Sequence, residues 1–189
     1  MAVAPLSRDR ILQAALTLAD AEGLEALSMR NLAQALGVKA MSLYNHVANK
    51  DDIIDALVDL VVSEIDRPNQ TGCCWRDPAL DWKTAMWMRA HSAHEVLLRH
   101  PWATLPLVSR VNVGPAMLSY VDATLGCLQK AGFGSELADH VWNALDSHIY
   151  GFTLQELNFP LEPTEYAQRA EDYIDRIPKD QYPHLHHLA

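Results

Sequence analysis

The chain has 189 residues, 49% of them hydrophobic, and its 24 acidic against 15 basic side chains give a formal net charge of −9. This charge excludes a protein that coats nucleic acid over its whole surface, because phosphate affinity needs cations, but it leaves room for one concentrated basic face. There is no run of about 18 uncharged apolar residues and no N-terminal signal-peptide pattern, so we expect a soluble, cytoplasmic protein without a membrane segment.

The pattern of the N-terminal third predicts four helices, because apolar residues recur there at the 3.6-residue helical period. Ser7, Ser28 and Asn49 are suited to cap three of them through a side-chain oxygen. Gly23 and Gly37 supply the left-handed residue that ends a helix at little cost. The expected helices span residues 8–22, 29–36, 40–46 and 50–66.

The rest of the chain also follows a helical pattern, after a turn-rich loop at residues 67–78. Pro101, Pro160 and Pro178 each stop a helix, since proline lacks the N–H that a helix interior needs. The expected helices span residues 80–100, 102–108, 115–131, 136–157 and 163–177, with a disordered or loosely packed tail from residue 181. Because no strand alternation occurs, the predicted fold class is all-α.

The stretch from Ser28 to Lys50 contains no carboxylate, although the protein as a whole is acidic. Two short helices flank a tight turn at Gly37, which is the arrangement of a helix-turn-helix whose second helix enters the DNA major groove. Leu43 and Val47 are expected to face the core. The outward residues expected to contact DNA are Lys39, Ala40, Met41, Ser42, Tyr44, Asn45 and His46.

This stretch resembles the TetR family of bacterial repressors, nearest to its tetracycline-repressor branch. The resemblance rests on the runs RILQAALTLADAEGLEALSM, RNLAQALGV and MSLYNHVANKDDIIDAL, and most specifically on the Leu-Tyr-x-His-Val-x-x-Lys pattern at residues 43–50. It implies contacts to base edges, phosphate or sugar by Arg30, Ala40, Met41, Ser42, Tyr44, His46 and Lys50. The best-known member has a polar base-reader at the position of residue 40, so alanine there implies a different operator.

The same resemblance implies the domain organisation. Residues 1–50 are expected to form a helix-turn-helix DNA-binding domain, residues 50–66 a linker helix, and residues 67–189 a ligand-binding and dimerisation domain. The helices at 136–157 and 164–177 are the expected dimer interface, since two-fold pairing lets two reading helices bind a palindromic site. The predicted interface residues are Leu137, Val141, Leu145, Ile149, Tyr166 and Tyr173.

Aromatic, methionine and histidine residues beyond residue 80 predict a small-molecule pocket between long helices. The alternative is an ordinary core, which is the commoner role of tryptophan and methionine at helical spacing. The predicted pocket residues are Trp87, His91, His94, Trp102, Met117, Tyr120, Trp142, His148 and Phe152. The sequence does not identify the effector.

The tetracycline-repressor branch binds a magnesium–tetracycline chelate through two histidines and a glutamate. His148 and Glu156 match two of these ligands in spacing, but the third position falls near Val108. The family's drug-contacting His, Asn and Phe are replaced here by Asp66, Arg89 and Ala93. We therefore predict a ligand other than tetracycline, and neither a metal nor a cofactor.

The predicted function is a ligand-responsive transcriptional repressor that binds a palindromic double-stranded DNA operator as a homodimer and is released by a small molecule. An activator of the same fold is an open alternative, because the sign of regulation depends on where the operator lies. An enzyme and a helical interaction protein without DNA binding are further alternatives. Asp146 with His148, or Cys127 with a histidine, are conceivable catalytic pairs, but no motif supports them, so no catalytic residue is predicted.

Overall fold

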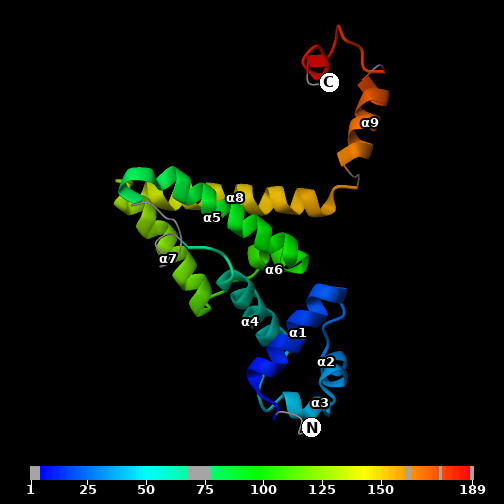
Figure 1. Ribbon diagram of the computed structural model, residues 1–189, viewed down its shortest axis with the longest axis vertical. Coiled ribbons are helices and arrows are strands. Elements are labelled where there is room, and N and C mark those ends of the chain that lie inside the picture. The colour runs from blue at the N-terminus through cyan, green and yellow to red at the C-terminus, as the bar shows by residue number, and fades with distance from the viewer. Residues whose placement is uncertain (1–4, 68–77, 161–162, 175, 188–189) are drawn as a thin grey trace. The chain divides into compact units, whose positions relative to one another are not determined.

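The computed structural model describes residues 5–67, 78–160, 163–174 and 176–187, which form helices and connecting turns without a strand (Figure 1). The chain divides into two units, residues 1–154 and 155–189, each described here by itself. The helices are α1 (Arg8–Glu22), α2 (Met29–Leu36), α3 (Ala40–Leu43), α4 (Lys50–Ser63), α5 (Pro78–Arg99), η1 (Pro101–Ala103), α6 (Thr104–Ser109), α7 (Pro115–Lys130), α8 (Ser135–Asn158), α9 (Pro163–Ile174) and η2 (Leu185–His187). The all-α fold class is confirmed, while most of the predicted loop at 67–78 lies outside the described residues.

Local capping sets the predicted boundaries of the N-terminal helices. Ser7 and Ser28 each accept a hydrogen bond from the backbone N–H three residues further on, at 3.2 and 3.1 Å, and Asn49 does the same at 2.8 Å. Gly23 and Gly37 follow α1 and α2 with φ angles of 79° and 69°, a region that glycine enters without strain. The predicted ranges of α1 and α2 are therefore confirmed.

The third helix is shorter than predicted, because α3 ends at Leu43 and not at residue 46. The backbone N–H groups of His46 and Val47 both turn back to the Leu43 carbonyl, at 2.9 and 3.1 Å. The chain turns tightly here because Val47 is buried and Asn49, two residues later, already caps α4. Residues 44–46 therefore lie on a turn that follows the helix.

The later helices also differ from expectation at their ends. The helix assigned to α5 breaks at Asp81, where φ is −149° and ψ is 57°. Asp81 Oδ1 accepts from the Thr84 N–H at 3.2 Å, so Asp81 acts as the N-cap of the longer helical part. The predicted helix at 102–108 is a 3-10 turn followed by α6, α9 ends at Ile174 instead of residue 177, and the tail contains the short turn η2.

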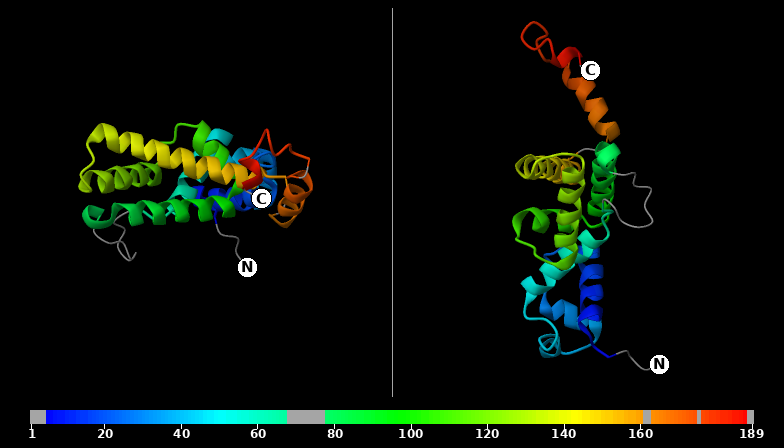
Figure 2. Two further views of the ribbon diagram at one scale, coloured as in Figure 1. Left: turned by 90° about the horizontal axis from the view of Figure 1, so that it is seen from above. Right: turned by 90° about the vertical axis from the view of Figure 1, so that its left-hand side faces the viewer.

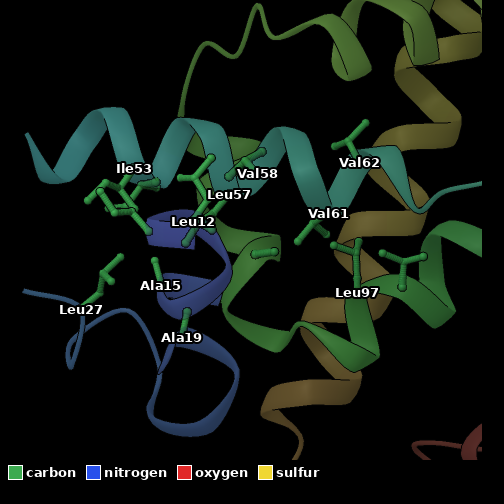
Figure 3. Close-up of a cluster of buried hydrophobic side chains, with 14 of the residues drawn as sticks. Leu12, Ala15, Ala19, Leu27, Ile53, Leu57, Val58, Val61, Val62 and Leu97 are labelled. Carbon is green, nitrogen blue, oxygen red and sulfur yellow. The ribbon is translucent and has the colours of Figure 1, made fainter. Parts of the chain in front are cut away.

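One apolar core joins the N-terminal helices to the helices that follow (Figure 3). α4 is the shared element, because its buried side chains face α1 on one stretch and α5 on the next. The core residues labelled in Figure 3 are Leu12, Ala15, Ala19, Leu27, Ile53, Leu57, Val58, Val61, Val62 and Leu97. Because such cores are close-packed, α4 cannot shift without disturbing its contacts with both groups of helices.

The helices after α4 form a layer in which α5 and α8 run roughly parallel, with α7 between them over part of their length (Figure 2). Polar contacts of Arg89 with Asp146 and of His94 with Thr153 join these two helices inside the first unit. A smaller apolar cluster closes one end of this layer and contains Ala85, Met86, Cys127, Leu128 and Ala138. α7 packs against both α4 and α5, which links this layer to the core around α4.

Candidate nucleic-acid interface and sensor core

The surface of residues 39–46, here called the recognition face, is held by two buried anchors. Leu43 and Val47 point into the core, as predicted. Met41 is 75% exposed and Tyr44 is 47% exposed. The other exposed members are Lys39 and Asn45, whereas Ala40, Ser42 and His46 are half-buried. The recognition face thus presents one apolar, one aromatic, one amide and one cationic side chain to solvent, with the small residues Ala40 and Ser42 partly covered.

Two cations flank the recognition face in different ways. Arg30 is exposed near the start of α2. Lys50 is half-buried, and its Nζ donates a hydrogen bond to the Leu24 carbonyl at 3.0 Å. This contact ties the first turn of α4 to the loop between α1 and α2. Lys50 therefore has a structural role, and its predicted phosphate contact remains a prediction.

An ion pair fixes the far end of the recognition face. Arg8 donates two hydrogen bonds to Asp52, at 2.9 and 3.0 Å, and a third to the His46 carbonyl at 3.3 Å. Asp52 also accepts from the Ala48 N–H at 3.0 Å. The pKa of Asp52 lies below its ordinary value because the hydrogen bonds from Arg8 and then from Ala48 favour the ionised carboxylate. This acidic side chain, close to the recognition face, is thereby neutralised by a cation of α1.

Carboxylates of α4 bind the segment that connects α6 to α7. Arg110 donates from Nε to Asp55 at 2.7 Å and from Nη1 to Asp51 at 3.1 Å. Asp59 accepts from the backbone N–H groups of Ala116 and Met117, at 3.3 and 2.9 Å, in the first turn of α7. α4 therefore supplies the acceptor that the start of α7 lacks.

A glycine permits this approach between α4 and α7. A Cβ atom added to Gly114 would lie 2.2 Å from Asp59 Oδ1, closer than any real contact. The backbone φ of Gly114 is ordinary at −62°, so the requirement is for space and not for an unusual conformation. Sequence reasoning did not identify this site, because the glycine resembles any other residue of a turn.

A second polar contact joins α1 to the end of α5. Asp20 Oδ1 accepts from the Trp102 indole N–H at 2.7 Å and lies 2.7 Å from His100 Nδ1. Glu64 beyond the end of α4 pairs with Arg99 at 2.8 Å. The indole N–H of Trp102 thus helps to hold α1, and its predicted place in a ligand pocket remains a prediction.

The remaining predicted pocket residues fall into separate groups. The ring of Phe152 lies 5.4 Å from that of His94 and 6.2 Å from that of His148, between α5 and α8. Trp87 and His91 form an exposed pair whose rings lie 5.4 Å apart. Tyr120 is buried, while Met117 and Trp142 are half-buried against the two apolar clusters. The structure thus does not gather the predicted residues into one pocket.

The layer formed by the helices after α4, here called the sensor layer, contains a buried polar cluster that sequence reasoning missed. The cluster is formed by Arg89, Tyr120, Asp146 and Tyr150. Arg89 is 0% exposed, donates from Nη2 to Asp146, and places its guanidinium 4.4 Å from the centre of the Tyr120 ring. The Tyr150 hydroxyl donates to the other Asp146 oxygen at 3.3 Å. Burial raises the pKa of Tyr120 and of Tyr150, so both phenols stay protonated.

This cluster leaves no support for the imagined pair of Asp146 and His148. The Asp146 carboxylate is directed to Arg89 and Tyr150, whereas His148 is exposed and stacks near Phe152. Among the residues that the structure describes, no three His, Cys, Asp or Glu side chains come together as metal ligands. Within the same part of the chain, no helix has the length and apolar character needed to cross a bilayer.

The predicted dimer residues lie in different environments. Leu137 of the first unit and Tyr166 and Tyr173 of the second unit are exposed. Val141 and Leu145 are half-buried against the smaller apolar cluster. Ile149 is only 5% exposed and belongs to the main core, so its assignment to a subunit interface is wrong. The period of α8 did not separate its inward from its outward apolar residues.

Comparison with known proteins gives two family matches. A model described as "Bacterial regulatory proteins, tetR family" matches residues 11–57. A second model, described as "Tetracyclin repressor-like, C-terminal domain", matches residues 76–189. The first covers the capped helices and the recognition face, and the second covers the helices of the sensor layer.

Individual relatives agree with these matches. An HTH-type transcriptional regulator from Saccharopolyspora erythraea is 38% identical over 77% of this chain and 59% of its own length. The HTH-type transcriptional repressor DrrR1 from Streptomyces coeruleorubidus is 30% identical over 88% of this chain and 56% of its own. The chain thus spans less than two thirds of the length of these relatives. The solved structure of ActR from Streptomyces coelicolor in complex with actinorhodin has a TM-score of 0.84 and 31% identity, covering 98% of this chain and 84% of ActR.

Proposed function

Because this chain belongs to the tetR family of bacterial regulatory proteins, we propose that it is a ligand-responsive transcriptional repressor acting in the cytoplasm. It binds a palindromic double-stranded DNA operator as a homodimer and releases it when a small molecule binds the sensor layer. The observation that carries this proposal is the carboxylate-free stretch from Ser28 to Lys50, which presents the recognition face. The name of DrrR1 as a repressor supports repression over activation.

The exposed side chains of the recognition face suit reading of a duplex. Met41 offers an apolar contact to a thymine methyl, and Asn45 offers both a donor and an acceptor to a base edge. Lys39 and Arg30 supply the cations that phosphate contacts need. Tyr44 is 47% exposed and has a hydroxyl that suits a contact to phosphate or sugar. One face reads only a few base pairs, so two copies related by a two-fold axis are required.

Operator binding should depend steeply on salt. If a dimer neutralises about six phosphates, its affinity falls about a thousandfold from roughly 50 to 200 mM salt. Lys39→Gln should make the slope of log affinity against log salt less negative by about 2 per dimer, one for each lysine. The matched control is Lys130→Gln, which removes another exposed cation, from the end of α7.

The measurement is fluorescence anisotropy with a duplex selected from random DNA by the purified protein. A selection that enriches no sequence would contradict the proposed function. An affinity that does not change with salt would do the same. If Lys39→Gln and Lys130→Gln alter the slope equally, the recognition face is not where phosphate binds.

The polar contacts of α4 offer a route from the sensor layer to the recognition face. A ligand that favours another position of α7 or α6 must move Asp59 or Arg110, and α4 then moves with them. A ligand changes DNA affinity only as far as it binds the two arrangements unequally, which is typically worth about 1–3 kcal/mol. The complex of ActR with actinorhodin supports the proposal that an effector binds the sensor layer here.

Asp59→Ala should uncouple the sensor from DNA. Without the carboxylate, the start of α7 no longer bonds to α4, so an effector found by thermal-shift screening should reduce operator affinity less than about fivefold instead of about tenfold or more. Asp122→Ala, an exposed carboxylate of the same α7, is the control and should keep the full response. Anisotropy titrations with and without the effector measure both values. A full response in Asp59→Ala would show that another contact carries the signal.

A further inference from the structure

We infer that the effector carries a carboxylate or another ionised acceptor oxygen, and that Arg89 binds it from inside the sensor layer. This inference rests on the proposed function, because it names the chemical class of ligand that the sensor takes. It depends on the buried cluster of Arg89, Tyr120, Asp146 and Tyr150. Position 89 is where the resemblance places the family's drug-contacting asparagine, and the change to a buried arginine paired with Asp146 is a departure of this chain.

The cluster has more hydrogen-bond donors than acceptors. Only Nη2 of the Arg89 guanidinium is paired, and its Nε and Nη1 are buried without a hydrogen-bond partner among the described residues. The Trp142 indole N–H, four residues before Asp146 on α8, is buried in the same condition. An arginine cannot lose its proton, and buried polar groups are rarely left unpaired, so this surplus of donors calls for an acceptor from outside the chain.

A groove in the surface leads to this cluster. It lies between α6 and α8, has a volume of about 420 Å³, and includes Asp146 and Tyr150 in its wall. The other lining residues are Val108, Asn143, Ser147, Gly151 and Leu154. The volume falls within the range of small-molecule sites, and the apolar Val108 and Leu154 suit an aromatic ring system. A molecule in the groove meets Asp146 and Tyr150 directly, with Arg89 behind them.

The charges of the cluster favour a ligand with an anionic group over one with a neutral polar group. Arg89 is a permanent cation, and Asp146 is the carboxylate paired with it when no ligand is bound. Tyr120 and Tyr150 are uncharged, and the Tyr150 hydroxyl donates to Asp146. An incoming carboxylate competes with Asp146 for the guanidinium and makes charge-assisted hydrogen bonds, which are about twice as strong as neutral ones. Asp146 thus occupies in the free protein the place that the ligand's anionic group takes in the complex.

The test uses the full-length protein with matched pairs of probes. These are benzoate, 2-naphthoate and anthraquinone-2-carboxylate, each compared with its neutral carboxamide, titrated by isothermal calorimetry at pH 7. The best-fitting carboxylate should bind about tenfold more tightly than its carboxamide, as expected for hydrogen bonds to a charged rather than a neutral acceptor. A carboxamide that binds as well as its carboxylate would overturn the inference. So would the failure of all three carboxylates to bind.

Two variants place the preference on Arg89. Asp146→Asn keeps the shape of the side chain but removes the competing charge, so carboxylate affinity should rise about tenfold while carboxamide affinity changes little. Arg89→Met combined with Asp146→Leu removes both charges and should abolish the preference for carboxylate. Circular dichroism confirms that each variant is folded. A tenfold preference that survives in the double variant would assign the anion to another group.

Operator binding by the unaltered protein, measured beside these titrations, separates the two claims. Sequence-specific DNA binding without a preference for carboxylate would contradict the proposed ligand class and leave the proposed function unaffected. A clear carboxylate preference in a protein that selects no DNA sequence would contradict the proposed function but support the anion site.

Discussion

Replacing Met41 by glutamate should abolish specific operator binding without unfolding the protein. Met41 is 75% exposed on the recognition face, so its substitution leaves the core unchanged and should alter the free energy of unfolding by less than about 0.5 kcal/mol. In the proposed complex, a carboxylate there would face both phosphates and base edges. A wrong contact typically costs about 1–3 kcal/mol for each base pair, and a dimer makes it twice. Operator affinity should therefore fall about a hundredfold or more.

Met41→Gln is the matched control, because it has nearly the size of glutamate and no charge. Its operator affinity should stay within about tenfold of the unaltered protein, since only the apolar contact is lost. Anisotropy titrations at one fixed salt concentration, with thermal unfolding of each variant, provide the comparison. Equal affinities for Met41→Glu and Met41→Gln would show that residue 41 does not face DNA. That result would remove the recognition face from the proposed interface.

The parts of the fold that the sequence predicted are those set by local signals. Ser7, Ser28 and Asn49 cap helices through contacts three residues away, and Gly23 and Gly37 end helices through their own φ angles. Such signals can be read within one turn of the chain. The length of α3 was predicted less well, because it ends where the cap of the next helix and the burial of Val47 compete with its continuation.

The long-range polar contacts of the first unit could not be predicted in this way. Arg8 and Asp52 are separated by 44 residues, Arg110 and Asp55 by 55, and Arg89 and Asp146 by 57. Charged residues at these distances follow no periodic pattern, so only the packing of the helices identifies the partners. Even the departure at Arg89 from the family's drug-contacting asparagine did not reveal that Asp146 would face it.

The surroundings of the predicted pocket and dimer residues could not be predicted from helical period either. Helical period places aromatic side chains on a face but does not say whether that face meets core, cavity or solvent. Trp87 is largely exposed, Tyr120 is buried, and Trp102 turns its indole N–H to Asp20, although all three were assigned to one pocket. Ile149 was assigned to the dimer interface for the same reason and lies in the core. Apolar character alone therefore did not separate these roles.

Replacing Arg89 alone by methionine should destabilise the protein strongly. The substitution leaves Asp146 without its cation in a largely buried site, since the Asp146 side chain retains only 14% exposure. Removing one partner of a buried ion pair typically costs about 3–5 kcal/mol, because the remaining charge is uncompensated. Replacing both partners, with Arg89→Met and Asp146→Leu, removes that penalty, and the unfolding free energy should return to within about 1 kcal/mol of the unaltered protein or exceed it.

Urea unfolding followed by far-UV circular dichroism measures these differences, at one protein concentration because the proposed dimer would make stability depend on concentration. Asp146→Leu alone completes the cycle and should also be destabilised, since it leaves Arg89 buried with no carboxylate. The coupling energy between the two sites follows from the four values. If the double variant lost as much stability as the sum of the single ones, the two charges would act independently. Arg89 would then stabilise the protein only through packing, and its charge would not favour an anionic ligand group at the position of Asp146.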